Sequence, residues 1–263
     1  MIGVFDSGLG GLSVLAAVAR ALPEADLLYF ADTAHLPYGN KSDAHICDRV
    51  AAIGHHLASQ GCDTLLVACN TATAAAVAAL RQQHPQIAVV GVEPGVKPAA
   101  ASSRSGRIAV LATESTARSQ RLAQLIDSHA AQVEVHIVAC PGWATRVETL
   151  HALDPDHEFA AEVAAKVLPL LAAGVDRLVL GCTHYSFLRP LLEPLLGDGD
   201  QLVDVAEAVA RQLVRLSGER QSGSGRLQLM ASAEPERLQA ALPALGLGWL
   251  MERLREPAQT VEV

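Results

Sequence analysis

Two cysteines occupy matching positions in two similar segments, and a matched pair of thiols is a rare catalytic arrangement. Residues 61–71 read GCDTLLVACNT and residues 174–184 read GVDRLVLGCTH, which aligns Cys69 with Cys182. In each segment a short apolar run, typical of a buried strand, leads directly to the thiol and to small polar residues. Two thiols that flank one cleft would be suited to inverting a carbon centre as a pair of acid/base groups.

The other cysteines, Cys47, Cys62 and Cys140, lack this placement. A single free cysteine is most often a small buried hydrophobic residue, and we interpret Cys47 and Cys62 in that way. Cys69 and Cys182 each follow a predicted strand and precede a predicted helix. Because the N–H groups and the dipole at a helix N-terminus favour a thiolate, we expect the pKa of both thiols to be lowered.

The residues beside the two thiols are suited to a zwitterionic ligand. Asn70 and Thr71 follow the first thiol, and Thr183 and His184 follow the second. Together with the N–H groups of a helix start these side chains could hold a carboxylate, although a threonine at this place is also a common helix cap. A lone histidine is more often structural, but His184 is close enough in sequence to set the protonation state of its thiol or to protonate a substrate.

The segment DSGLGGL (6–12) ends the first predicted strand and begins with Asp6 and Ser7. Its glycines permit a tight turn, but Ser13 breaks the G-x-G-x-x-G dinucleotide pattern, and no Lys-Ser/Thr pair makes it a phosphate loop. The matching position in the second half is Ala112. We therefore expect Asp6 to act in one half only, by binding an ammonium group or as a base beside the first thiol; a turn-forming role is the alternative.

The turn Pro37-Tyr38-Gly39 follows the second predicted strand, where it could present a hydroxyl and backbone N–H groups to the same cleft. No C-x-x-C pair is present for zinc or redox chemistry. None of the three lysines lies in a setting typical of a pyridoxal Schiff base. We therefore expect neither a cofactor nor a metal.

The composition excludes several classes of partner. The 263 residues carry a net charge of −8 without a basic stripe, which argues against nucleic acid. No apolar run is long enough to span a bilayer, and no charged-then-apolar leader opens the sequence, so we expect no membrane association. The five widely spaced cysteines indicate reduced thiols and a cytoplasmic protein.

Apolar runs alternate with helix-period segments along almost the whole chain. The apolar runs predict strands at 2–5, 27–31, 64–68, 88–91, 107–111, 133–138, 177–181 and 226–230. The periodic segments predict helices at 11–21, 43–59, 71–83, 115–127, 157–172, 187–196, 204–217 and 234–241. This alternation is typical of parallel sheets covered by helices on both faces, in which ligands bind beyond the carboxyl ends of the strands.

The repeat divides the chain into two related α/β halves with parallel sheets and a ligand cleft between them. The segment EPGVKP (93–98), rich in Pro and Gly, is the expected crossover. We predict a discontinuous first domain of residues 1–93 plus 206–263 and a second domain of residues 94–205.

Five segments together carry a family resemblance. They are DSGLGGL (6–12), ADTAHLPYG (31–39), ACNTATA (68–74), GVEPGVKPA (91–99) and GCTHY (181–185). In this order they resemble the signature segments of the bacterial glutamate racemase family. The two cysteine motifs resemble those of the wider aspartate/glutamate racemase superfamily, whereas the PYG turn and the CNTATA motif favour its glutamate branch.

This resemblance implies two pseudo-symmetric flavodoxin-like domains and a cofactor-independent racemase, a homodimer, that supplies D-glutamate for peptidoglycan synthesis. It implies that Cys69 and Cys182 are the proton acceptor and donor, with glutamate as the substrate. Asp6 and His184 would each assist one thiol, and Glu148 would lie near His184 or the substrate ammonium group. The residues that the resemblance assigns to substrate binding are Asp6, Ser7, Tyr38, Gly39, Asn70, Thr71, Thr183, His184 and Glu148.

Other functions remain open at the level of sequence. The nearest is an aspartate racemase or another two-thiol racemase such as a hydantoin racemase. A non-catalytic amino-acid-binding protein, or an acidic protein that inhibits a DNA-handling enzyme by contact, belongs to a different class. The presence of both thiols favours an active racemase over these binding functions.

Overall fold

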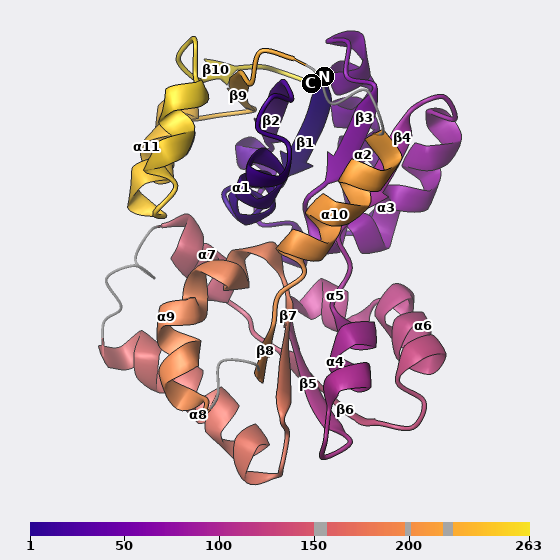
Figure 1. The fold of residues 1–263 in the computed structure, drawn as a ribbon, viewed down its shortest axis with the longest axis vertical. Coiled ribbons are helices and arrows are strands. Elements are labelled where there is room, and N and C mark those ends of the chain that lie inside the picture. The colour runs from indigo at the N-terminus through magenta and orange to yellow at the C-terminus, as the bar shows by residue number, and fades with distance from the viewer. Residues whose placement is uncertain (150–156, 198–200, 218–222) are drawn as a thin grey trace.

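The computed structural model describes residues 1–149, 157–197, 201–217 and 223–263, which form two α/β halves, one above the other in Figure 1. The upper half contains a six-stranded sheet in the order β10-β9-β2-β1-β3-β4, and all of its strand pairs are parallel. Its strands are β1 (Ile2–Asp6), β2 (Leu27–Ala31), β3 (Thr64–Val67), β4 (Ala88–Gly91), β9 (Leu227–Ala231) and β10 (Gln259–Thr260).

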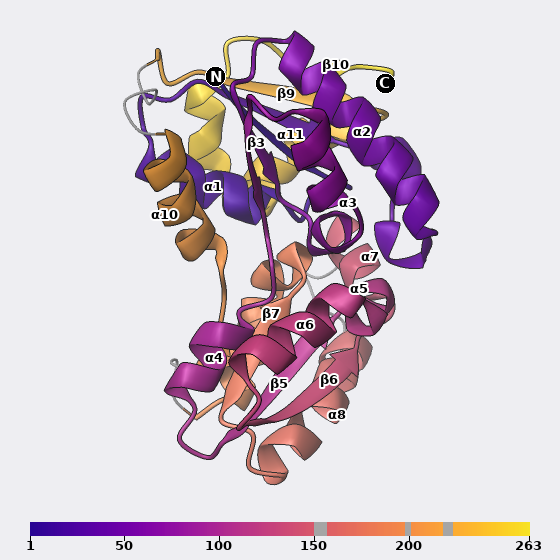
Figure 2. The same cartoon turned by 90° about the vertical axis from the view of Figure 1, so that its right-hand side faces the viewer.

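Helices cover both faces of this sheet because its central strands are apolar on both sides. Consecutive residues of β1 illustrate this: Val4 packs in one core cluster and Phe5 in another, and both are fully buried. The first cluster takes in α1 (Leu12–Ala21), α10 (Ala206–Ser217) and α11 (Pro235–Ala244). The second takes in α2 (Asp43–Ser59) and α3 (Asn70–Gln83). Figure 2 shows the two layers on opposite sides of the strands.

The lower half repeats this plan with a four-stranded parallel sheet in the order β6-β5-β7-β8. Its strands are β5 (Arg107–Ala112), β6 (Glu134–Ala139), β7 (Arg177–Gly181) and β8 (Leu202–Val203). One face packs against α4 (Val96–Ser102) and α6 (Gln120–His129). The other face packs against α7 (Trp143–Glu148), α8 (His157–Ala172) and α9 (Arg189–Leu192).

The order and register of the strands confirm that the two cysteine segments are equivalent, since Thr64 pairs with Ile2 as Arg177 pairs with Ile108. In the upper sheet β1 lies between β2 and β3, and in the lower sheet β5 lies between β6 and β7. Cys69 follows the end of β3 and Cys182 follows the end of β7. Asp6 ends β1 as Ala112 ends β5. The predicted α/β class with two parallel sheets is therefore confirmed.

Several element boundaries differ from the sequence prediction. The helix predicted at 115–127 is two helices, α5 (Glu114–Arg118) and α6, because Ser119 adopts an extended conformation and its side chain caps α6 through the N–H of Leu122. The helix predicted at 187–196 is the short α9 with a 3-10 segment on each side. Pro190 and Pro194 lie in this segment, and each lacks the N–H that a longer α-helix would use.

The chain passes from the first sheet to the second between β4 and β5 and returns between β8 and β9. The domain boundaries at 93/94 and 205/206 remain a prediction. Within the described residues, no helix is both long and apolar enough to cross a membrane.

Candidate active site

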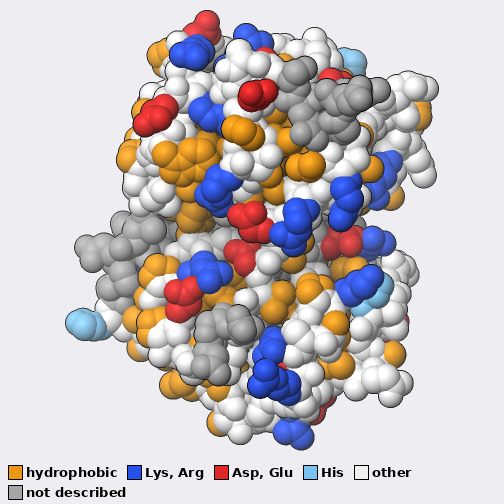
Figure 3. All heavy atoms as spheres, viewed as in Figure 1, with side chains coloured by type: hydrophobic (Ala, Val, Ile, Leu, Met, Phe, Trp, Pro, Cys, Tyr) orange, Lys and Arg blue, Asp and Glu red, His pale blue; other side chains and the backbone are white. Residues whose placement is uncertain are grey.

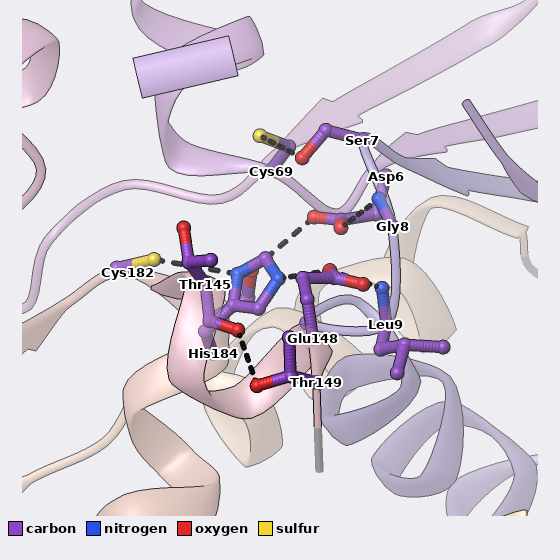
Figure 4. A network of polar contacts seen from close by, with 12 residues as sticks. Asp6, Ser7, Gly8, Leu9, Cys69, Thr145, Glu148, Thr149, Cys182 and His184 are labelled. Carbon is purple, nitrogen blue, oxygen red and sulfur yellow. Dashed lines mark hydrogen bonds and ion pairs between the residues drawn. The ribbon is translucent and has the colours of Figure 1, made fainter. Parts of the chain in front are cut away.

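A cavity of about 140 Å³ lies between the two halves, and both thiols are on its wall. Cys69 and Cys182 approach it from opposite sides, the first from the upper half and the second from the lower half (Figure 4). Both side chains are buried. Most of the residues expected at the site line this cavity: Ser7, Tyr38, Gly39, Cys69, Asn70, Thr71, Glu148, Cys182 and His184.

Cys69 occupies the N-cap position of α3, with extended backbone dihedral angles. Its Sγ lies 4.0 Å from the Ser7 hydroxyl oxygen. Burial, followed by the charge of Asp6, raises the pKa of the Cys69 thiol, and these effects outweigh the N–H groups of Ala72 and Ser7 that favour the thiolate. The expected lowering of this pKa by the helix N-terminus is therefore wrong for Cys69, because the buried sulfur has lost its contact with water.

Cys182 precedes a 3-10 helix (Thr183–Leu188) rather than the expected α-helix. Its Sγ lies 3.6 Å from Nδ1 of His184, and Nε2 of the same ring lies 2.5 Å from Oε1 of Glu148. Burial opposes the charge of the imidazolium, but the Cys182 sulfur and the Glu148 carboxylate outweigh it and raise the pKa of His184 well above its ordinary value. The second thiol therefore lies beside a histidine that retains its proton.

Glu148 ends α7 and is buried, and it contacts His184, one of its two expected neighbours. Its Oε1 accepts hydrogen bonds from His184 and from the backbone N–H of Leu9 at 2.7 Å. A Cβ atom at Gly8 would collide with this carboxylate, and a Cβ atom at Gly10 would collide with the His184 ring. The glycines of the first loop therefore admit side chains from the other half of the molecule.

Asp6 and Thr183 do not line the cavity but lie directly behind it. The fully buried Asp6 carboxylate accepts a hydrogen bond from the N–H of Gly8 at 2.8 Å and another from the Thr183 hydroxyl at 3.2 Å. Burial raises the pKa of Asp6, and the neighbouring His184 opposes this shift. Asp6 therefore links the loop after β1 to the cysteine segment of the second half.

The turn after β2 lines the cavity through Tyr38 and Gly39, and the Tyr38 hydroxyl is bound to a buried carboxylate. The Tyr38 hydroxyl donates to Oδ2 of Asp32 at 2.5 Å, and Arg49 donates to both oxygens of the same carboxylate at 3.0 and 2.9 Å. That the Tyr38 hydroxyl faces the cleft remains a prediction. Asp32 was missed as a supporting residue, although it follows β2 directly, where polar residues of parallel sheets gather.

Two further polar side chains at the cavity already have protein partners. The Asn70 amide donates to the carbonyl of Val92 at 3.2 Å. The Thr71 hydroxyl lies 3.1 Å from that of Thr113 and 3.3 Å from that of Thr116, which belong to the other half. Thr113 was not predicted from the sequence, although it follows β5 in the same way that Ser7 follows β1.

A group of three buried residues has the composition of a metal site. Ligand atoms of Asp6, Glu148 and His184 all lie within 4.8 Å of one another. However, the Glu148 oxygen and the His184 nitrogen nearest each other are hydrogen-bonded together, and the Asp6 oxygens accept from Gly8 and Thr183. The expectation that no metal takes part remains a prediction.

The fold and the two opposed thiols define a class, a two-sheet α/β racemase whose site lies between its halves. The profile of the Asp/Glu/Hydantoin racemase family matches residues 2–213 of the chain. The chain belongs to this family.

Individual relatives are similar to this chain over almost its full length. A glutamate racemase of Ectopseudomonas mendocina is 47% identical over 248 residues, which cover 93% of this chain and 94% of the relative. A glutamate racemase isoform of Bacillus anthracis has a solved structure with a TM-score of 0.86 at 28% identity, covering 100% of this chain and 97% of its own. The Escherichia coli glutamate racemase, solved in complex with L-glutamate and the activator UDP-MurNAc-ala, gives a TM-score of 0.85 at 29% identity, with 100% and 98% coverage.

Proposed function

We propose that this racemase interconverts L- and D-glutamate without a cofactor, by transferring protons to and from the Cα atom through Cys69 and Cys182. The observation that supports this most strongly is the shared cavity, which has one buried sulfur on each side. Its volume of about 140 Å³ is roughly ten times what a single water requires, which suits a small amino acid.

The protonation states of the two halves suit a base on one side and an acid on the other. Burial and Asp6 keep the Cys69 thiol protonated. The protonated His184 lies 3.6 Å from the Cys182 sulfur and stabilises negative charge there. In one direction, the Cys182 thiolate removes the Cα proton and the Cys69 thiol delivers its own proton to the opposite face. The sulfurs exchange protonation states, and the reverse reaction begins from that state.

The carbanion that forms between the two steps requires stabilisation from its surroundings. Helix α3 begins at the cavity beside Cys69, and the first N–H groups of a helix lack helical acceptors. Among the described residues that line the cavity, His184 alone has a side chain that carries positive charge at neutral pH. Backbone N–H groups and hydroxyls therefore bind the substrate carboxylates, and closure of the two halves excludes the water that would otherwise quench the carbanion.

We assign substrate binding to the side chains and backbone that border this space. Ser7, Asn70 and Thr71 lie on the Cys69 side, and Glu148 lies on the Cys182 side, where Thr183 stands behind the cavity wall. Substrate would displace Thr113 from the Thr71 hydroxyl, which then becomes a donor to a carboxylate. Tyr38 and Gly39 also line the cavity.

The choice of glutamate rests on the relatives, which are glutamate racemases at close to half identity. D-glutamate would serve peptidoglycan synthesis, and the need for two reduced thiols places the enzyme in the cytoplasm. We also propose that it acts as a homodimer, as the family resemblance implies.

Deuterium incorporation tests this function. In D₂O, L-glutamate should gain deuterium at Cα while its circular dichroism signal decays to zero, and L-aspartate should show neither change. Incorporation into aspartate instead would assign the chain to the aspartate branch. An absence of incorporation into either amino acid would leave only a binding function and overturn the proposal.

A further inference from the structure

Glu148 is held by the first half of the molecule at both of its ends. At the side-chain end the N–H of Leu9 donates to the carboxylate. At the backbone end Nη2 of Arg237 donates to the Glu148 carbonyl oxygen at 2.6 Å. Arg237 belongs to α11, which packs on the upper sheet, whereas Glu148 ends α7 in the lower half. Figure 1 shows α11 reaching down towards α7.

The carbonyl that Arg237 binds lies at the end of a short helix, where backbone acceptors lack helical partners. The Thr149 hydroxyl donates to the carbonyl of Arg146 at 3.1 Å and to that of Thr145 at 3.1 Å, and the Thr145 carbonyl also accepts from the Thr149 N–H. Arg237 accounts for the carbonyl of Glu148 itself. A cation is favoured at this end of a helix, so the contact fixes the last turn of α7.

A second residue of the upper half holds the guanidinium in place. Glu234, the N-cap of α11, has φ 51° and ψ 53°, left-handed dihedral angles that disfavour any residue with a Cβ atom. Its carboxylate lies 3.0 Å from Nη1 of Arg237. Both side chains are about half exposed, so the ion pair itself adds little stability. Strain of this kind persists at sites whose geometry is required for function.

We propose that Arg237 is a positioning residue for racemisation, which holds Glu148 across the interface so that Glu148, His184 and Cys182 align. This inference rests on the proposed function. Closure of the halves brings the Leu9 N–H and the Arg237 guanidinium onto Glu148 together. Separation of the halves breaks both hydrogen bonds and releases the carboxylate from its fixed place beside His184. Closure therefore places Glu148 beside His184, the partner of the second thiol, at the same time as it excludes water.

The test compares Arg237→Met with Arg189→Met. Arg189 is a matched control because it is similarly exposed and also pairs with a glutamate, Glu193, but within its own half. We expect kcat/KM for L-glutamate to fall about tenfold or more in Arg237→Met, since small displacements of catalytic groups have effects of this size, and to stay within about twofold of wild type in Arg189→Met. Glu234→Gln, which keeps the carbonyl contact available, should fall between the two.

The pH profile separates positioning from a loss of stability. A loosely held Glu148 stabilises the imidazolium of His184 less, so the alkaline limb of the kcat/KM profile should move to lower pH in Arg237→Met. The limb should return towards its original place in Arg237→Lys. It should also return when guanidinium is added to Arg237→Met, with sodium chloride as the control. An unmoved limb, at any level of activity, would overturn the inference. If Arg237→Met does not fold, Arg237→Gln takes its place, and an unmoved limb in that variant would overturn the inference in the same way. Wild-type deuterium incorporation is measured alongside, so that failure of the proposed function itself is recognised separately.

Discussion

The two thiols of this protein occupy equivalent places in the repeat but have different surroundings. Cys69 faces a hydroxyl and a carboxylate, Ser7 and Asp6, which come from the end of β1 in its own half. Cys182 faces an imidazole, His184, from its own segment, backed by Glu148 from α7. Burial and Asp6 raise the pKa of the first thiol, whereas a protonated histidine lies beside the second.

This difference shows that the repeat determines where a sulfur lies and not what it does. The position after a parallel strand is set by the backbone, which both halves share. The carboxylate near each thiol comes from a different element. In the first half Asp6 ends β1, whereas its counterpart Ala112 at the end of β5 has no carboxylate. The second half supplies Glu148 from helix α7 instead. On the face drawn in Figure 3, charged side chains of both signs lie along the junction of the halves.

Removing either sulfur removes one of the two thiols compared above and should have the largest effect on racemisation. Cys69→Ala and Cys182→Ala should each lower racemisation by about a thousandfold or more, because each leaves one face of Cα without an acid/base group. Each variant should still eliminate a good β-leaving group from one enantiomer only, a different one in each case. Circular dichroism measures racemisation, and Cys62→Ala is the control. Retention of racemisation in either variant would refute the two-thiol mechanism.

Gly10→Ala should disable the Cys182 half alone. The added Cβ atom would collide with the His184 ring, which is packed too tightly to move away freely. We expect kcat/KM to fall about a hundredfold, as for other small displacements of catalytic groups. Gly197→Ala is the control, because no atom of the described residues lies within 4 Å of the new Cβ position there. Equal activities of the two variants would contradict the packing described for His184.

Glu148→Gln should move the pH profile through His184. The carboxylate helps to raise the pKa of His184, so the amide should lower that pKa, and the protonated form should be lost at lower pH. The alkaline limb of kcat/KM should therefore shift downwards, with a fall of about tenfold or more at its maximum. A limb that stays in place would show that His184 does not depend on Glu148.

Asp6→Asn should act on the other thiol. The Asp6 charge helps to raise the pKa of Cys69, so its removal should allow the Cys69 thiolate to form at lower pH. Mass spectrometry of alkylated Cys69 across a pH series should show the onset of modification at lower pH in this variant and at the wild-type pH in Glu148→Gln. A shift in both variants would mean that the two halves are not independent.

Removal of metals and of pyridoxal phosphate should have the smallest effect. Dialysis against a chelator or treatment with hydroxylamine should leave kcat/KM within about twofold of its starting value, since both acid/base groups of the proposed mechanism belong to the chain. A tenfold response to either treatment, reversed by adding the metal or the cofactor back, would contradict this prediction.

The sequence predicted most of the fold because the main elements are local. The strands of both sheet centres were predicted within about a residue, since a buried parallel strand is a continuous apolar run. The two-residue strands β8 and β10 and the short helices α4 and α7 were missed, because elements of this length carry too little periodic signal. The break at Ser119 was missed for a similar reason, since a single side-chain cap decided it.

The sequence by itself determined the two thiols, their place after equivalent strands, the glycine loop and the family to which these belong. Only the tertiary structure decided that Glu148 meets His184 and that the Tyr38 hydroxyl points to Asp32. It also decided that the Cys69 pKa rises where a helix N-terminus alone predicts a fall. The physical reason is that strands and helices follow from neighbours in sequence, whereas these contacts and charges depend on the docking of the two halves and the water which that docking excludes.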